Sequence, residues 1–326
     1  MPLPDWLVER GIGETRAVQL SGGRIVAAKI AWPGELAAGA VVEGVLVSRA
    51  AGSKRGTVRL EGGEEVLVDR LPKDASEGAP IRIEIHRARI DEGARSKRAQ
   101  GRPSNAALSP APDLADRLKA AGQAVRIVPR FPACDWNELV AEAIDRVIAF
   151  DGGALHLSPT PAMTLIDIDG TLPPRALALA AVPAVADCLR RLDIGGSIGI
   201  DFPTLQEKAD RRAVDEALAL ALDGFPHERT AMNGFGFVQI VARLEGPSIL
   251  QRLARHRLSA AARLLLRRAE AVTEPGAILL RVHPALEPRL TDDLLAELGR
   301  RTGREIRIET DPALAPEAGM AQAVPL

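Results

Sequence analysis

Short apolar runs that alternate with polar positions dominate the first ninety residues, which is the pattern of β-strands. Residues 16–20 and 24–30 flank Ser21-Gly22-Gly23, a sequence typical of a hairpin turn. Further strands are expected at residues 41–47, 57–60, 65–68 and 81–85, separated by turns that contain Gly, Lys and Asp. Several short strands at this spacing predict a small antiparallel β-barrel.

Residues 91–112 have no apolar period and mix basic residues with Gly, Ser, Pro and Asn. The basic residues include Arg95, Lys97, Arg98 and Arg102. This composition is typical of a flexible basic linker, either a solvated tether or a segment that contacts RNA.

From residue 113 onward, helical periods alternate with short apolar runs, as expected for an α/β domain. Helices are predicted at residues 113–121, 137–148, 175–192 and 205–222, and strands at 125–128, 154–157, 163–168, 197–200, 229–231 and 235–242. A strand, a helix and a strand are then expected at 277–282, 292–301 and 305–309. The last residues, from 312, are rich in Ala, Pro and Gly and are predicted to be disordered.

One long helix is predicted between these two regions, at residues 249–272, and Pro275-Gly276 ends it. Its arginines are Arg252, Arg255, Arg257, Arg263, Arg267 and Arg268. They form either a solvated face or a surface that follows an RNA backbone.

Composition narrows the possible functions. The 326 residues suggest two or three domains, and a net charge of −1 means that any nucleic-acid binding must come from local patches. Cys134 and Cys188, the two cysteines, argue against a disulfide scaffold or a cysteine zinc site, and both are expected to be small buried residues. The start of the chain does not resemble a signal peptide and no apolar run could span a membrane, so a cytoplasmic protein is expected. The histidines, including His156, lack metal-ligand spacing and are interpreted as structural or surface residues.

Two aspartates, Asp167 and Asp201, each follow a buried apolar strand directly. If the two strands are neighbours, the carboxylates meet and their repulsion must be offset by a cation. Magnesium prefers oxygen ligands and serves phosphodiester chemistry, so a Mg²⁺ site is predicted. The alternative is that one aspartate caps a helix and the other lies in a turn.

The first of these segments, Asp167-Ile168-Asp169-Gly170-Thr171-Leu172, resembles the nucleophile motif of haloacid dehalogenase-like phosphatases. In that reading Asp167 attacks phosphorus and Asp169 is the general acid–base. That motif usually opens the first strand of a doubly wound domain, whereas here about 160 residues precede it. The phosphatase is therefore the less favoured alternative.

A longer resemblance involves segments that follow one another along most of the chain. They are Gly13-Glu14-Thr15-Arg16, Asn137-Glu138-Leu139, Gly152-Gly153, Ala162-Met163-Thr164, Leu192-Asp193-Ile194-Gly195-Gly196, Arg212-Ala213-Val214-Asp215, Phe235-Gly236 and Thr302-Gly303-Arg304-Glu305-Ile306. In this order they resemble the catalytic region of the ribonuclease E/G family.

The resemblance implies an α+β multidomain fold. It comprises an RNase H-like part (1–34 and 113–150), an S1-like barrel (35–90), a basic linker (91–112), a DNase I-like catalytic subdomain (151–245), an Arg-rich helix (246–275), a small β-α-β domain (276–311) and a disordered tail (312–326). The linker stands where the family has its 5′-monophosphate sensor, so no 5′-end dependence is expected. The Arg-rich helix stands where the family has its zinc link, so any homodimer is expected not to be zinc-linked.

The resemblance also implies an activity, namely Mg²⁺-dependent endonucleolytic cleavage of single-stranded RNA during RNA processing or decay. The catalytic residues would be Asp167, Asp201 and Asp169. Asp167 and Asp201 would bind the metal, and Asp169 stands where the family usually has Asn. The residues expected to contact RNA are Arg95, Lys97, Arg98, Arg102, Arg212 and Arg255. A salt bridge to Asp210 or Asp215 is the alternative role of Arg212.

Two departures from the family favour an alternative function, an RNA-binding protein with weak or lost catalysis. Residues 41–89 contain no Phe, Tyr or Trp, although the family's barrel presents aromatic rings for base stacking. Gly234 stands where the family has an Arg before its Phe-Gly pair.

Overall fold

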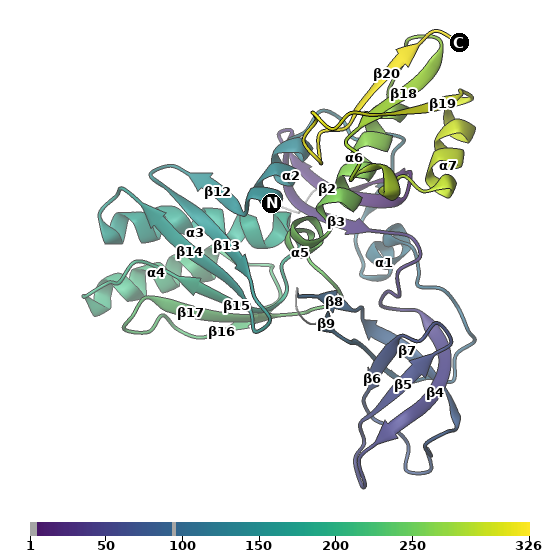
Figure 1. The fold of residues 1–326 in the computed structure, drawn as a ribbon. Helices are drawn as coiled ribbons and strands as arrows, with labels where there is room; N and C mark the ends of the chain where they lie inside the picture. Colours follow the sequence, from purple (N-terminus) through teal and green to yellow (C-terminus); the bar gives the residue numbers. More distant parts are fainter. Residues whose placement is uncertain (1–4, 93–95) are drawn as a thin grey trace.

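The computed structural model describes residues 5–92 and 96–326 of the chain. It is a mixed α+β structure, in which a closed five-stranded barrel lies apart from a six-stranded sheet (Figure 1). A four-stranded N-terminal sheet and a three-stranded C-terminal sheet complete the architecture, with a small two-stranded sheet beside the barrel. Among the described residues, no helix is long and apolar enough to cross a bilayer.

The N-terminal sheet contains the predicted hairpin. Its strands are β1 (Trp6–Gly11), β2 (Glu14–Ser21), β3 (Arg24–Ala31) and β11 (Val125–Ile127), in the order β11-β1-β2-β3. Gly22 and Gly23 have φ angles of 59° and 82°, the left-handed conformations that a two-residue hairpin turn requires. Helix α1 (Leu114–Ala120) precedes β11, and Asp113 caps it by accepting a hydrogen bond from the Asp116 N–H.

The barrel is closed by a strand from the segment that was expected to be a linker. Its strands are β4 (Val41–Arg49), β5 (Gly56–Leu60), β6 (Glu65–Val68), β7 (Pro80–Arg87) and β10 (Ala99–Pro103). Strand β10 pairs with β6 in parallel and with β7 antiparallel, so the predictions of a flexible linker and of an all-antiparallel barrel were both wrong. Small residues make this closure possible, because Ala99 is fully buried and a Cβ at Gly101 would lie 3.0 Å from the Glu84 carbonyl oxygen.

A short hairpin of β8 (Ile90–Asp91) and β9 (Ser96–Lys97) links β7 to β10. The Ala88 N–H donates to the Glu245 carbonyl oxygen at 2.8 Å, which ties the exit of β7 to the chain that follows the six-stranded sheet. Figure 1 accordingly shows the hairpin between the barrel and that sheet. Arg95 lies outside the described residues.

The six-stranded sheet is mixed. Its strands are β12 (Val147–Phe150), β13 (Gly153–Pro159), β14 (Thr164–Gly170), β15 (Gly196–Asp201), β16 (His227–Arg229) and β17 (Phe237–Ala242), in the order β12-β13-β14-β15-β17-β16. Strands β14 and β15 are parallel, whereas the other neighbours in this sheet are antiparallel. Buried side chains of the sheet share one core with helices α3 (Pro174–Arg191) and α4 (Lys208–Ala221).

Helix α2 (Trp136–Asp145) is shorter than predicted. It ends because Arg146 adopts a left-handed conformation, with φ of 60°, and the next residues form strand β12. The apolar residues Val147 and Ile148 therefore belong to the sheet and not to the helix that was predicted to include them.

The predicted long Arg-rich helix is two helices, α5 (Ile249–Arg255) and α6 (Arg257–Glu270). The break falls at His256, whose ring packs edge-on against Trp32 with 6.0 Å between centroids. The guanidinium groups of Arg252 and Arg263 lie 4.8 and 4.1 Å from the Trp32 ring centre. These two arginines therefore stack on an interior ring, and neither the solvated nor the RNA-facing interpretation holds for them.

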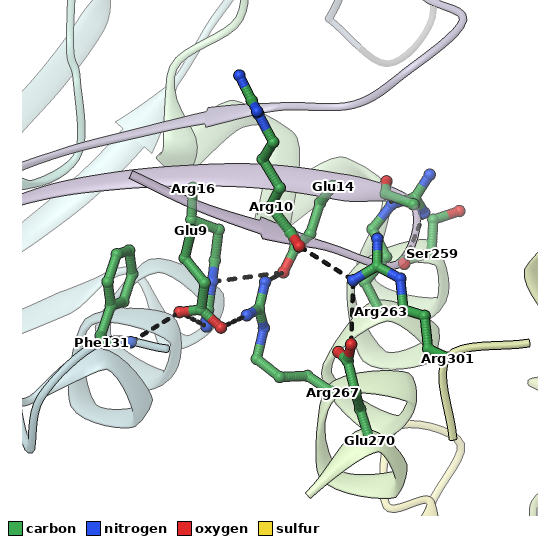
Figure 2. Close-up of polar contacts among 11 residues, drawn as sticks. Glu9, Arg10, Glu14, Arg16, Phe131, Ser259, Arg263, Arg267, Glu270 and Arg301 are labelled. Carbon is green, nitrogen blue, oxygen red and sulfur yellow. Dashed lines mark hydrogen bonds and ion pairs between the residues drawn. The ribbon is translucent and has the colours of Figure 1, made fainter. Parts of the chain in front are cut away.

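Arg267 is also an interior residue. Figure 2 shows its guanidinium between Glu9 and Glu14, where it contacts Glu9 and lies 3.1 Å from a Glu14 carboxylate oxygen. Arg16 pairs with Glu9 at 3.0 Å, and burial, followed by the charge of Arg267, lowers the pKa of Arg16 to about 10. This ion-pair network joins β1 and β2 to α6.

The C-terminal unit has the expected strand–helix–strand order with one further strand. Its elements are β18 (Ala277–Val282), a 3₁₀ turn η1 (Glu287–Arg289), α7 (Asp292–Thr302), β19 (Ile306–Thr310) and β20 (Met320–Val324). Strand β18 lies between β19, which is parallel to it, and β20, which is antiparallel. The prediction of a disordered tail was wrong because β20 pairs with β18 over its whole length and Ala321 packs on the C-terminal core.

Both cysteines are free thiols. Cys188 is buried, as predicted, and burial raises its pKa. Cys134 is half-buried, a more exposed position than the sequence suggested.

Candidate functional site

Asp167 and Asp201 are direct neighbours across two strands. Strands β14 and β15 are parallel and adjacent, and their register pairs Asp167 with Asp201. Neighbouring strands lie about 4.8 Å apart, so two side chains in register on one face emerge close together. The residues before them, Ile166 and Ile200, are fully buried, whereas both aspartates are exposed. The carboxylates therefore project from the face of the sheet opposite the core.

The same face of the sheet carries further side chains beside the two aspartates. His156 of β13 is in register with Asp167, and Phe237 of β17 is in register with Asp201. Asp169 lies two residues beyond Asp167 on the same side, and its Oδ1 accepts a hydrogen bond of 2.8 Å from the Gly170 N–H. We call His156, Asp167, Asp169 and Asp201 the carboxylate row.

The donor chemistry of this row fits magnesium. Mg²⁺ is commonly held by one or two carboxylates, with water and substrate phosphate oxygens completing its octahedron. Asp167 and Asp201 offer two such carboxylates side by side. In the described part of the chain, no group of three or more His, Cys, Asp or Glu side chains is close enough to share an ion.

The loop after Asp201 is joined to the loop before β17. The Phe202 N–H donates to the Gly236 carbonyl oxygen at 3.2 Å, and Phe202 itself is buried. Gly236 has a φ of 89°, and a Cβ there would lie 2.4 Å from the Phe202 carbonyl oxygen. Only glycine fits this position, which is the structural reason for the Phe-Gly pair in the sequence.

The basic residues predicted to contact RNA lie outside the strands of the carboxylate row. Lys97 pairs with Glu92 at 2.6 Å, and Arg98 pairs with Glu65 of the barrel at 3.0 Å. Arg102 is exposed on β10. These three residues therefore belong to the barrel and its exit hairpin.

The remaining two lie on helices. Arg255 is exposed on α5, where its Nη2 donates to the Glu92 carbonyl oxygen at 3.4 Å. Arg212, exposed on α4, pairs with Glu216 at 2.8 Å, so the predicted partners Asp210 and Asp215 were wrong. Residues four apart face each other on a helix, which accounts for the choice of Glu216.

Two features of this region were not predicted from the sequence, namely the place of His156 and the exposure of Phe235. His156 was interpreted as structural or surface, yet it stands beside Asp167. The alternation Leu155-His156-Leu157 was the available signal, since two buried neighbours place the histidine on the opposite face. Phe235, in the loop before β17, has 81% of its surface exposed, and no local pattern indicates this.

A cavity of about 680 Å³ lies elsewhere, between the β2–β3 turn, α2 and α3. Arg191 is buried beside it and pairs with Asp135 and Glu142 at 3.1 and 3.0 Å. Burial raises the pKa of Glu142, although Arg191 acts in the opposite direction. No residue of the carboxylate row lines this cavity.

Comparison with known proteins gives one family. The family model described as Ribonuclease E/G family matches residues 83–243, about half of the chain. The match begins within β7 of the barrel, ends just after β17 and includes every member of the carboxylate row. No curated protein matches the chain. Through residues 83–243, the chain belongs to the ribonuclease E/G family.

Proposed function

We propose that the protein is a Mg²⁺-dependent endoribonuclease that cleaves single-stranded RNA, with Asp167 and Asp201 as metal ligands. The observation that carries the proposal is the in-register pairing of these exposed aspartates on adjacent parallel strands. Membership of a ribonuclease family supports the substrate class.

The finer domain identities are part of the same proposal. The closed five-stranded barrel would be the S1-like domain, the N-terminal sheet the RNase H-like part and the six-stranded sheet the DNase I-like subdomain. The order of these units along the chain supports the assignment, because the family match runs from the barrel into the six-stranded sheet.

The residues of the chain would hold and orient the reacting groups. A bound magnesium ion would supply activation of water and neutralisation of charge on the scissile phosphate. Because Ile166 and Ile200 are buried, the strands hold the two carboxylates in fixed positions. Asp169 is oriented by the Gly170 N–H, and His156 offers a polar side chain beside Asp167, toward the same substrate face.

The second candidate is an RNA-binding protein of the same family with weak or lost catalysis. Two features of the sequence favour this alternative. The barrel segment 41–89 contains no Phe, Tyr or Trp, and Gly234 stands where the family resemblance places a basic residue. The phosphatase is not proposed, because β14 lies beside the antiparallel strand β13 and not within a doubly wound parallel sheet.

Cleavage of a fluorescently labelled single-stranded RNA tests the proposal. We expect cleavage with Mg²⁺, no cleavage after EDTA treatment, and no cleavage by Asp201→Asn, which keeps the shape of the side chain. Glu287→Gln, at an exposed position in the C-terminal unit, is the control and should cleave normally. RNA with a 5′-hydroxyl and RNA with a 5′-monophosphate are expected to be cut equally.

The same assay separates the alternatives. If the wild-type protein binds RNA but leaves it intact with Mg²⁺, the binding-only function replaces the nuclease. The phosphatase function would be favoured if the wild-type protein hydrolysed a phosphomonoester but did not cleave RNA, and if Asp167→Asn abolished that hydrolysis.

A further inference from the structure

The aromatic residues of this chain are few and almost all are covered. The sequence contains three Trp, six Phe and no Tyr, and all nine lie in the described residues. Trp6, Trp32, Trp136 and Phe202 are buried, and Phe131, Phe150, Phe225 and Phe237 are half-buried. Phe235 alone among these nine is exposed, with 81% of its surface accessible. Phe235 is therefore the one Phe, Tyr or Trp ring among the described residues that is open for a base to stack on.

The loop that carries Phe235 is held in one conformation by its own hydrogen bonds. The Asn233 Oδ1 accepts from the N–H groups of Phe235 and Phe237, at 2.9 and 3.1 Å. The Asp215 carboxylate accepts from the Met232 N–H at 3.1 and 3.0 Å and pairs with Arg229. An apolar ring is thus presented to solvent on an ordered loop, which reduces the entropy lost when a ligand stacks on it.

This ring stands near the proposed metal ligands along the sheet. Strand β17 begins at Phe237, which is the register partner of Asp201. Phe235 is two residues before it, so its Cα lies at most about 7 Å from the Cα of Phe237. The Thr204 hydroxyl donates to the Phe235 carbonyl oxygen at 3.5 Å, which links the ring's loop to the loop that follows Asp201.

We propose that Phe235 is the platform on which a base of single-stranded RNA stacks, beside the nucleotide held at Asp201. The inference rests on the proposed function in taking RNA as the ligand. Every base offers a π-face, so such a platform grips the strand with little preference for sequence. It supplies, next to the carboxylate row, the stacking surface that the barrel lacks.

Measurements of RNA binding by a variant that is expected not to cleave RNA test this assignment. In an Asp201→Asn background, the affinity for a labelled single-stranded RNA is measured by fluorescence anisotropy. Phe235→Ala is expected to weaken binding by roughly 5- to 150-fold, the loss typical of one stacked base. Phe235→Leu should weaken it similarly, because Leu keeps apolar area without a π-face, and Phe235→Trp should restore it. Leu220→Ala is the matched control, since Leu220 is 78% exposed on α4 and should not affect affinity.

An abasic RNA series identifies the contact itself. Removing the stacked base should weaken binding to the Phe235-containing protein and have little effect on Phe235→Ala, so the two changes are not additive. Unchanged affinity in Phe235→Ala and Phe235→Leu would overturn the proposal. The proposal would also be overturned if the wild-type protein bound no RNA, or if removal of the Phe235 ring changed only the oligomeric state.

The outcomes for the two proposals are distinguishable. If the wild-type protein does not cleave RNA but Phe235→Ala weakens binding, the stacking platform stands and the nuclease fails. If RNA is cleaved while the Phe235 variants bind as tightly as the parent, the nuclease stands and the platform fails.

Discussion

Asp167 and Asp201 owe their position to the isoleucines that precede them. Ile166 and Ile200 are fully buried, and the two-residue period of a strand then turns the next side chain to the opposite face. A shift of either strand by one residue would bury a carboxylate and expose an isoleucine. The burial of these isoleucines therefore fixes the register that brings the aspartates together.

Asp169 is expected to tolerate replacement by an amide. Asp169→Asn keeps an oxygen that can accept the Gly170 N–H, so cleavage should change by only a few-fold. Asp201→Asn removes a proposed metal ligand and should lower cleavage by at least about 100-fold, beyond the usual effect of supporting residues. Cleavage rates at saturating Mg²⁺ measure both, and equal losses in the two variants would contradict the assignment of roles.

Glu142 should make the stability of the protein depend on pH. Burial raises its pKa above the ordinary value of 4.5, so the folded protein holds this proton more tightly than the unfolded chain. The folded state then binds more protons in the window above pH 4.5, and the free energy of unfolding falls as pH rises through it. An amide cannot titrate, so the Glu142→Gln variant should lack this decrease.

Urea unfolding between about pH 4 and about pH 7 measures the difference between wild type and Glu142→Gln. Glu287→Gln, at an exposed position in the C-terminal unit, is the control and should follow the wild-type profile. A constant difference between wild type and Glu142→Gln over this range would contradict the prediction.

At the scale of elements, charged side chains on the buried face of α6 attach this helix to the N-terminal sheet. Arg267 reaches Glu9 and Glu14 (Figure 2). Arg263 donates to the Gly13 carbonyl oxygen at 2.7 Å. Glu9 is further held by the Phe131 N–H at 3.1 Å. The sequence shows only a helix rich in arginine, because the acidic partners lie some 250 residues away in the chain.

Arg267→Met is expected to destabilise the protein by about 3 kcal/mol, because Glu9 and Glu14 would remain buried without this partner. Arg268→Met, one residue further on the exposed side of the same helix, should cost less than about 1 kcal/mol. Chemical denaturation gives both values. Equal effects would mean that the network around Glu9 contributes little to stability.

At the scale of the whole molecule, the C-terminal residues complete a sheet. Strand β20 pairs with β18, the central strand of the three, whose side chains Ile278, Leu280 and Val282 are fully buried. Without β20, one edge of β18 would lose its hydrogen-bond partners and part of its cover.

Deletion of residues 312–326 should therefore loosen the C-terminal unit and leave the rest of the protein intact. Amide hydrogen exchange is expected to rise sharply in β18, while exchange in β14 and β15 stays unchanged. Deletion of Leu326 alone, beyond β20, is the control. Unchanged protection of β18 in the long deletion would contradict the pairing.

Local patterns were sufficient for most elements and insufficient for their partners. The strands β4 to β7 and the helices α3 and α7 were predicted near their observed bounds, since each has a clear period of its own. Strand β1 was missed because its buried run, Trp6 to Val8, does not alternate. Strand β10 was missed because its small residues resemble a linker until the barrel surrounds them.

The sequence by itself determined that two apolar strands carry aspartates and which face of each strand is buried, because the pleat makes this a local property. The expectation that both aspartates end their strands was correct for Asp201 and wrong for Asp167, since β14 continues to Gly170. Only the tertiary structure decided that these strands are parallel neighbours in register, so that Asp167 and Asp201 form a pair. It also decided that Arg267 is interior and that Phe235 is exposed. These features depend on contacts between residues far apart in the chain, where no periodic pattern records the partner.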